Sequence, residues 1–303
     1  MKTALFVALG IFTAGFVLLW ALAMIGSRRD LRPAETAQPA KAPGLLDMAI
    51  GFATNFFDTL GIGSFATTSA VFKFFGLVRD EQIPGTLNVG HTLPSILQAF
   101  IYIAVVEVNV VTLIVMIAAA AGGAWLGAGI VSGLSRRKIQ IGMGTALLAA
   151  AVIMALSALK WVPAGGNLLE IWGAKLALAI VCNAILGALM TIGIGLYAPC
   201  MILVSLLGMN PKAAFPIMMG SCAFLMPVGS VRFVRTQKYN LKSALGLAIG
   251  GIPGVLLAAF IVKSLPLDVV RWLVVGVVIY TSAMMLHSAA SERRQGRLVA
   301  QVS

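Results

Sequence analysis

Two ionisable side chains, Asp58 and His91, lie within apolar stretches of the sequence. An ionisable residue inside a membrane-crossing segment costs roughly 2.5–3.5 kcal/mol on the milder insertion scale, so such a residue is a candidate for function. Histidine changes charge near neutral pH and can donate a hydrogen bond to an anion. We predict that Asp58 or His91 handles a coupling proton. The alternatives are a helix cap for Asp58 and a hydrogen-bonded core histidine for His91.

Glycines and hydroxyl residues directly after Asp58 are typical of a small-anion site. Gly61 and Gly63 interrupt the apolar run, and glycine lets a backbone turn sharply and approach a ligand closely. A helix that restarts inside the membrane presents unpaired N–H groups and a partial positive charge to an anion. The alternative is that small residues only let helices pack closely. The candidate ligands from this region and the next span are Thr59, Gly61, Gly63, Ser64, Thr67, Thr68, Asn88 and His91.

A second stretch repeats this pattern further along the chain. Residues 191–195 (TIGIG) match residues 59–63 (TLGIG) at an offset of 132, and Gly208 and Pro216 match Gly76 and Pro84 at the same offset. The Gly-Gly pair at 122–123 matches the pair at 250–251 at an offset of 128. Duplicated halves are common in secondary transporters. The second half adds the candidates Thr191, Gly193, Gly195, Tyr197, Cys200, Ser221 and Cys222, whereas Met190 occupies the position of Asp58.

The composition predicts an all-α polytopic membrane protein. The chain has 303 residues, of which 60% are hydrophobic and 11% are charged. This leaves too few polar side chains to cover a soluble surface, which excludes a soluble enzyme, a disordered chain and a secreted disulfide scaffold. The net charge of +12 comes mostly from short basic clusters between apolar runs, which orient membrane helices. We therefore predict contact with the lipid bilayer and no binding of nucleic acid.

The chain divides into four predicted parts. They are an N-terminal transmembrane helix with a cytoplasmic linker (1–44), a first repeat (45–158), a second repeat (159–290) and a basic cytoplasmic tail (291–303). The predicted crossings are 3–25, 84–104, 109–132, 139–158, 213–231, 241–262 and 269–289. The N-terminus is expected outside the cell, and the C-terminus in the cytoplasm.

Each repeat opens with a glycine-broken segment, 45–76 or 172–208, of more than 30 residues. If both segments are re-entrant hairpins, 15 Lys and Arg residues lie inside and 5 outside. If both segments cross, the numbers are 12 and 8. The positive-inside bias favours hairpins. Each repeat then crosses three times, so the two repeats have opposite orientation, and the two breaks form a central site. The alternative is a pair of kinked helices packed through glycine.

Taken together, these motifs resemble the TauE/SafE family of sulfite-exporter-like permeases. The resemblance spans about 45–290 and rests on the duplicated Gly-x-Gly break, the glycine that ends each broken segment and the Pro-containing loop after it. It rests also on the second span of each half, with Gly90-His91-Thr92 in one and Gly220-Ser221-Cys222 in the other. The resemblance implies export or uptake of small sulfur oxyanions or organosulfonates such as sulfite, thiosulfate or sulfoacetate.

We therefore predict a secondary transporter for a small sulfur-containing anion in the bacterial inner membrane. The alternatives are an anion channel of the same architecture and a carrier for another small organic anion. The sequence has no paired catalytic carboxylates, no nucleophile elbow and no GxxxxGK[ST] motif, which argues against an enzyme and against direct ATP drive. The three cysteines form no CxxC pair, so neither a metal nor a cofactor is expected. A homodimer is left open.

Overall fold

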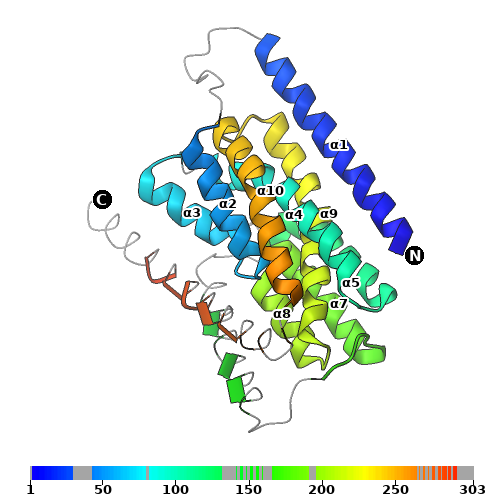
Figure 1. Ribbon diagram of the computed structural model, residues 1–303. Helices are drawn as coiled ribbons and strands as arrows, with labels where there is room; N and C mark the ends of the chain where they lie inside the picture. Colours follow the sequence, from blue (N-terminus) through cyan, green and yellow to red (C-terminus); the bar gives the residue numbers. More distant parts are fainter. Residues whose placement is uncertain are drawn as a thin grey trace. The chain divides into compact units, whose positions relative to one another are not determined.

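The computed structural model describes residues 2–29, 43–79, 82–131, 166–190 and 196–264, with isolated positions within 141–159 and 266–291 (Figure 1). The described chain is helical and contains no strand, in agreement with the predicted class. Its helices are α1 (Lys2–Arg29), α2 (Leu45–Thr59), α3 (Ser64–Phe75), α4 (Ile83–Val105), α5 (Val110–Val131), α7 (Gly173–Met190), α8 (Tyr197–Leu206), the 3-10 turn η2 (Pro211–Ala213), α9 (Ala214–Arg235) and α10 (Leu241–Ser264).

Four of the described segments are long and apolar enough to cross a membrane: Lys2–Ile25, Gly173–Met190, Pro211–Arg235 and Leu241–Ile261. The α7 helix is one of them, although the sequence predicts it as an arm of a hairpin. The α4 helix has 23 residues and is not among the four, because polar side chains on its inner face lower its hydropathy. The linker 33–42, most of the crossings 139–158 and 269–289, and the tail from 292 lie outside the described residues.

The chain forms two compact units, each built from segments of both predicted repeats. The first unit contains the described parts of Met1–Thr59, Gly63–Val105 and Met219–Lys263. The second contains the described parts of Leu60–Ile62, Val106–Met218 and Ser264–Ser303. The four predicted domains stay a prediction.

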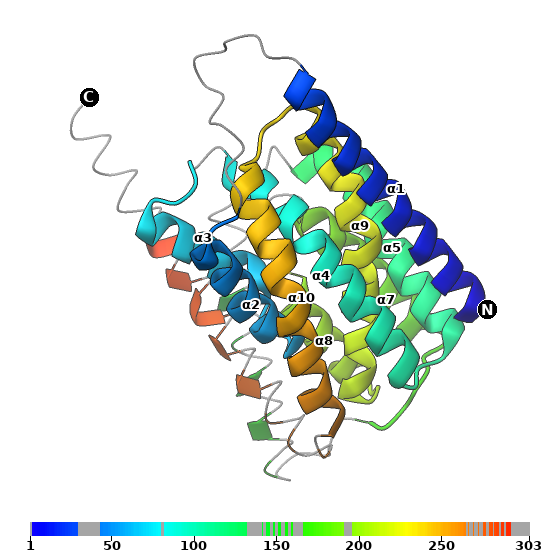
Figure 2. The same cartoon turned by 45° about the horizontal axis from the view of Figure 1, so that its top comes forward.

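In the first unit, α2 packs against α10 through glycines (Figures 1 and 2). Gly246, Gly250 and Gly254 recur every four residues and therefore lie on one face of α10. A Cβ atom on any of the three would overlap the Cβ or backbone atoms of Asp47, Met48 or Phe52, respectively. Small residues at this spacing allow two membrane helices to approach until their backbones touch. The glycines of α10 thus set the position of the polar helix α2.

The α1 helix also belongs to the first unit. Phe6 stacks on Phe100 of α4 with ring centroids 5.9 Å apart, and Phe12 meets Phe224 of α9 edge-on at 5.1 Å. The Trp20 indole N–H donates a hydrogen bond to the Tyr239 hydroxyl, 3.2 Å away, in the turn before α10. Burial raises the pKa of Tyr239, an effect that the hydrogen bond from Trp20 opposes. These aromatic contacts fix α1 on α4 and α9.

In the second unit, α5 and α7 make the same kind of contact. A Cβ atom on Gly123 would overlap the carbonyl oxygen of Ala184, and one on Gly187 would overlap that of Ala120. The Asn183 amide donates to the carbonyl oxygen of Met116 at 2.7 Å. Backbone contact through glycine therefore holds one helix pair in each unit, α2 with α10 and α5 with α7.

One helix of each of these pairs, α5 and α10, begins with the same kind of N-terminal cap. Asn109 accepts hydrogen bonds from the backbone N–H of Val111 and Thr112, at 2.9 and 3.2 Å, and caps α5. Asn240 accepts from the backbone N–H of Ser243 at 3.0 Å and caps α10. These asparagine caps are 131 residues apart in the sequence. Each one binds N–H groups that a helix N-terminus otherwise leaves unpaired.

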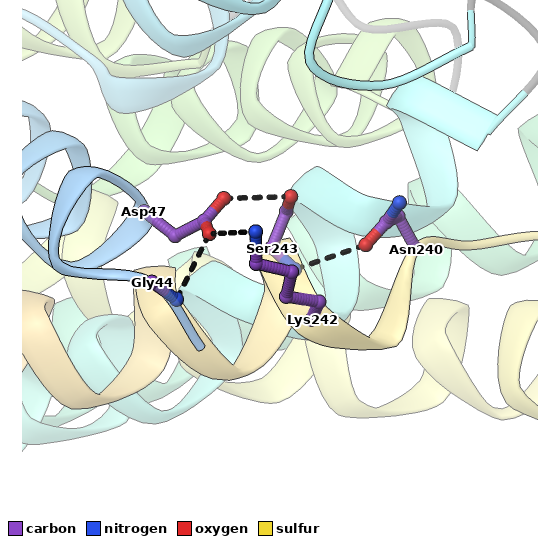
Figure 3. Close-up of polar contacts among 5 residues, drawn as sticks. All are labelled: Gly44, Asp47, Asn240, Lys242 and Ser243. Atoms are coloured by element: carbon purple, nitrogen blue, oxygen red, sulfur yellow. Dashed lines mark hydrogen bonds and ion pairs between the residues drawn. The ribbon is translucent and has the colours of Figure 1, made fainter. Parts of the chain in front are cut away.

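Next to the second cap, Asp47 joins the first turns of α2 and α10 (Figure 3). Its carboxylate accepts hydrogen bonds from the Ser243 hydroxyl at 2.9 Å and from the Gly44 backbone N–H at 3.1 Å, and it pairs with the Lys242 ammonium at 3.4 Å. Asp47 is buried, whereas Lys242 is about half exposed. The Ser243 hydroxyl and the Gly44 N–H therefore stabilise the carboxylate more than the exposed Lys242 ammonium does, since exposed ion pairs contribute little to stability.

We expect Ser243→Ala to lower the stability of the protein by about 1–3 kcal/mol, because a buried carboxylate loses a hydrogen bond. Thr112 on α5 is the matched control. It stands 131 residues before Ser243, is fully buried, and its hydroxyl has no hydrogen-bond partner among the described residues. Thr112→Val should therefore leave the stability unchanged or raise it. Thermal unfolding of both variants in one detergent checks the difference, and equal losses would contradict it.

Candidate functional site

Polar side chains occupy one face of α2 in the first unit. Asp47, Thr54, Asn55, Asp58 and Thr59 are all buried, and their spacings of three, four and seven residues place them on one side of the helix. The opposite face of the helix is apolar and exposed, with Phe52 and Phe57 on it. The helix is therefore amphipathic in the reverse sense of a soluble helix, with its polar residues directed inward.

The helix α2 ends at a backbone break made by two glycines. Gly61 has a φ of 98° and Gly63 a φ of 86°, values that side chains disfavour and glycine adopts freely. The chain becomes helical again at Ser64, where α3 begins. The predicted break at 61–63 is confirmed. The corresponding glycines, Gly193 and Gly195, and Thr191 lie outside the described residues.

Asp58 binds the new helix across this break. Its Oδ1 accepts from the backbone N–H of Ser64, the first residue of α3, at 2.5 Å. Its Oδ2 accepts from the Gln98 side-chain amide on α4 at 2.9 Å. Asp58 is 2% exposed. The carboxylate therefore caps α3, which is the alternative role that the sequence leaves open for it, and it occupies an N–H group that the predicted anion site needs.

His91 is fully buried and connects α2, α3 and α4. Its Nδ1 lies 3.0 Å from Oδ1 of Asn55, and its Nε2 lies 3.1 Å from the Thr68 hydroxyl. The ring also lies 6.0 Å from the ring of Phe65, measured between centroids. Asn55 in turn donates to the Gly51 carbonyl oxygen at 2.8 Å. Both ring nitrogens thus have partners, and Thr68 and His91, both predicted as ligands, are brought together.

Gln98 connects Asp58 to the residues that surround His91. Its amide nitrogen donates to Thr59 Oγ1 at 2.9 Å as well as to Asp58. The Thr59 hydroxyl donates to the carbonyl oxygen of Asn55 at 2.7 Å, and its own carbonyl accepts from the Tyr102 hydroxyl at 3.2 Å. A continuous polar network therefore runs from Ser64 through Asp58 and Gln98 to Asn55 and His91.

The other predicted ligands lie elsewhere on α3, α4 and α9 or in the second unit. Thr67 donates to the carbonyl oxygens of Gly63 and Ser64, and Asn88 donates to that of Pro84, so both bind backbone on their own helix or at its start. Ser221 and Cys222 are buried on α9 in the first unit. The remaining predicted ligands belong to the second unit: Gly61, Tyr197 and Cys200. A Cβ atom on Gly61 would lie 3.0 Å from Cε of Met201 there.

Sequence reasoning missed Asn55 and Gln98, the two amides that hold His91 and Asp58. Asn55 could have been found, because it lies three residues before Asp58 and four after Gly51, on the inward face of α2. Gln98 lies seven residues after His91, which is two helical turns, and therefore on the same side of α4. Among the described residues, no group of three His, Cys, Asp or Glu side chains could hold a metal ion.

Apolar helices of membrane-crossing length, packed through glycine around buried polar side chains, define a multi-pass helical membrane protein. Residues 176–302 match the family model described as "Sulfite exporter TauE/SafE", which confirms the resemblance to that family over this part of the chain. Comparisons with curated proteins and with solved structures gave no match.

Proposed function

We propose that the protein is a secondary transporter for a small sulfur-containing anion such as sulfite, thiosulfate or an organosulfonate. The family match over 176–302 supports a sulfur-compound permease. The observation that carries the assignment of a site is the buried network of Asn55, Asp58, Thr68, His91 and Gln98 around a glycine-broken helix. Polar groups held at this depth are expensive in a membrane and are typical of a substrate or ion pathway.

We further propose that the chain consists of two inverted repeats, each opening with a re-entrant hairpin. The paired asparagine caps at 109 and 240 and the glycine contacts of α5 with α7 and of α2 with α10 support a duplication. The glycines that end α3 and α8, Gly76 and Gly208, both have positive φ. Thiol labelling decides the topology. Cysteines placed at Gly44 and Arg79 should react from the same, cytoplasmic face, and reaction from opposite faces would overturn the first hairpin.

Transport into proteoliposomes tests the function. We expect saturable uptake of radiolabelled sulfite or thiosulfate, inhibited by an excess of the other anion, with counterflow when the lumen is preloaded. Thr68→Val should reduce the rate at least ten-fold, because a hydrogen bond to a charged ligand contributes roughly 1.5–3 kcal/mol. Thr112→Val, which removes a buried hydroxyl outside the network, is the control and should retain the rate. A non-saturating conductance would instead favour an anion channel. Absence of flux for all sulfur anions would refute the proposal.

A further inference from the structure

We propose that Thr68 and His91 form a proton-controlled hydrogen-bond switch for the transported anion. With His91 neutral, the Thr68 hydroxyl donates to the ring. When a proton from solution binds Nε2, the ring becomes the donor, and the hydroxyl hydrogen is released to bind an anion. This inference rests on the proposed function and specifies how a proton would be coupled to it.

The hydrogen-bond partners determine which ring nitrogen carries the proton. The carbonyl oxygen of Gly51 can only accept, so the atom of Asn55 that lies 2.8 Å from it is the amide nitrogen. The other amide atom, 3.0 Å from the ring, is therefore the oxygen, which can only accept. Nδ1 of His91 must then be the N–H donor. In the neutral ring Nε2 is consequently an acceptor, and the Thr68 hydroxyl donates to it across 3.1 Å.

The Thr68 hydroxyl has one hydrogen to donate, and its environment limits where that hydrogen goes. Among the described residues, its one hydrogen-bond partner is His91. The nearest alternative is the carbonyl oxygen of Ser64, one helical turn earlier. That oxygen already accepts the Thr67 hydroxyl at 2.9 Å in addition to its helical bond. After protonation of the ring, the released hydrogen therefore needs a new acceptor, and an anionic oxygen is the strongest one available.

No charged side chain has a described contact with the His91 ring. Asp58 lies three residues beyond Asn55 on α2, and its carboxylate is bound to Ser64 and Gln98. Asp47 pairs with Lys242 at the other end of α2. The ionisable residues carried by the helices packed around His91 are Asp47 and Asp58 on α2, Lys73 on α3, Tyr102 on α4, Lys242 and Lys263 on α10, Lys2, Arg28 and Arg29 on α1, and Cys222, Arg232 and Arg235 on α9.

The switch predicts the sign of the pH dependence. An anion that binds the protonated state must, by linkage, promote proton uptake at His91, and lowering the pH must strengthen anion binding. Thiosulfate is the suitable probe, because it keeps its charge over the range of about pH 5 to 8 in which histidine ordinarily titrates. We expect its affinity to rise about ten-fold or more across this range, as one charge-assisted hydrogen bond is gained.

Magnetic resonance of the histidine rings tests the switch directly. The chain has two histidines, so a His287→Gln variant labelled with ¹⁵N-histidine reports on His91 alone. Without ligand, the ring should be neutral, with its proton on Nδ1. Addition of thiosulfate at constant pH should protonate both nitrogens. A proton on Nε2 in the free state, or a ring that stays neutral in the thiosulfate complex, would overturn the proposal.

Two variants separate the switch from a merely structural hydroxyl. Thr68→Ser keeps the hydroxyl and should keep the pH dependence, whereas Thr68→Val should bind thiosulfate weakly and at a pH-independent affinity. Thr112→Val should behave like the wild type. If wild-type protein binds thiosulfate with no pH dependence, the switch fails and the proposed function stands. If it binds and transports neither thiosulfate nor sulfite nor sulfonates at any pH, the proposed function itself fails.

Discussion

Replacing Asp58 with leucine is expected to destabilise the first unit by about 2–6 kcal/mol. The substitution removes the acceptor of two buried N–H groups, the Ser64 backbone N–H and one of the two N–H groups of the Gln98 amide, each at a cost of about 1–3 kcal/mol. Because Asp58 is almost completely buried, water cannot replace the lost acceptor without opening the structure. The start of α3 should lose order first, since its first N–H loses its cap.

A paired substitution distinguishes hydrogen bonding from loss of packing. Asp58→Asn keeps an acceptor for Ser64 but turns an N–H group toward the Gln98 amide, so two donors face each other. Adding Gln98→Glu exchanges donor and acceptor and should recover at least half of the stability lost in Asp58→Asn. Thermal unfolding of the single and double variants, analysed as a double-mutant cycle, measures the coupling. Additive effects would contradict the direct bond between these side chains.

The same double variant tests whether Asp58 carries a proton. If Asp58 only caps α3, the Asp58→Asn, Gln98→Glu protein should transport with the wild-type pH profile, because the cap and the interhelical bond are both present. If the carboxylate at position 58 is itself the proton carrier, coupling should be lost although the protein is folded. The hydrogen-bond geometry favours the first outcome, with His91 as the proton carrier.

The second large effect is expected at Gly123, one of two adjacent glycines in the middle of α5. Gly123→Ala should destabilise the packing of α5 on α7 by about 1–3 kcal/mol, because the added Cβ overlaps the carbonyl oxygen of Ala184 and the helices must separate. Gly122 has no atom within 4 Å of the same added Cβ. Gly122→Ala should therefore be neutral or stabilise by up to about 1 kcal/mol, as alanine favours a helix more than glycine does.

The comparison isolates interhelical contact, since the two residues share one helix and one depth. Unfolding temperature and the fraction of monodisperse protein after extraction provide the readout. Losses of stability of similar size at both positions would contradict the prediction. They would mean that the glycines contribute helix flexibility and not contact between the helix backbones. Gly246, Gly250 and Gly254 of α10 should respond as Gly123 does, because each one faces backbone or Cβ atoms of α2.

The class of the protein and the break at Gly61–Gly63 could be predicted from the sequence because both depend on local chemistry. Apolar composition excludes a water-covered surface, and glycine is the residue that adopts the backbone angles observed there. Asp58 and His91 were identifiable for a similar reason, since ionisable groups in apolar segments are rare. The repeat pattern also predicts paired features, and the caps at Asn109 and Asn240 are such a pair.

The partners of these residues were decided by the tertiary structure alone. Asn55 and Gln98 are ordinary amides in the sequence, and they gain roles only because α2 and α4 meet with those positions face to face. The close approach of α10 depends on glycines about 200 residues from the α2 backbone that they touch. A hydrogen bond needs its donor and acceptor within about 3 Å, and no rule of local spacing supplies that proximity between distant segments. The sequence by itself thus determined which residues are unusual for a membrane interior, and helix packing decided which of them are bonded to each other.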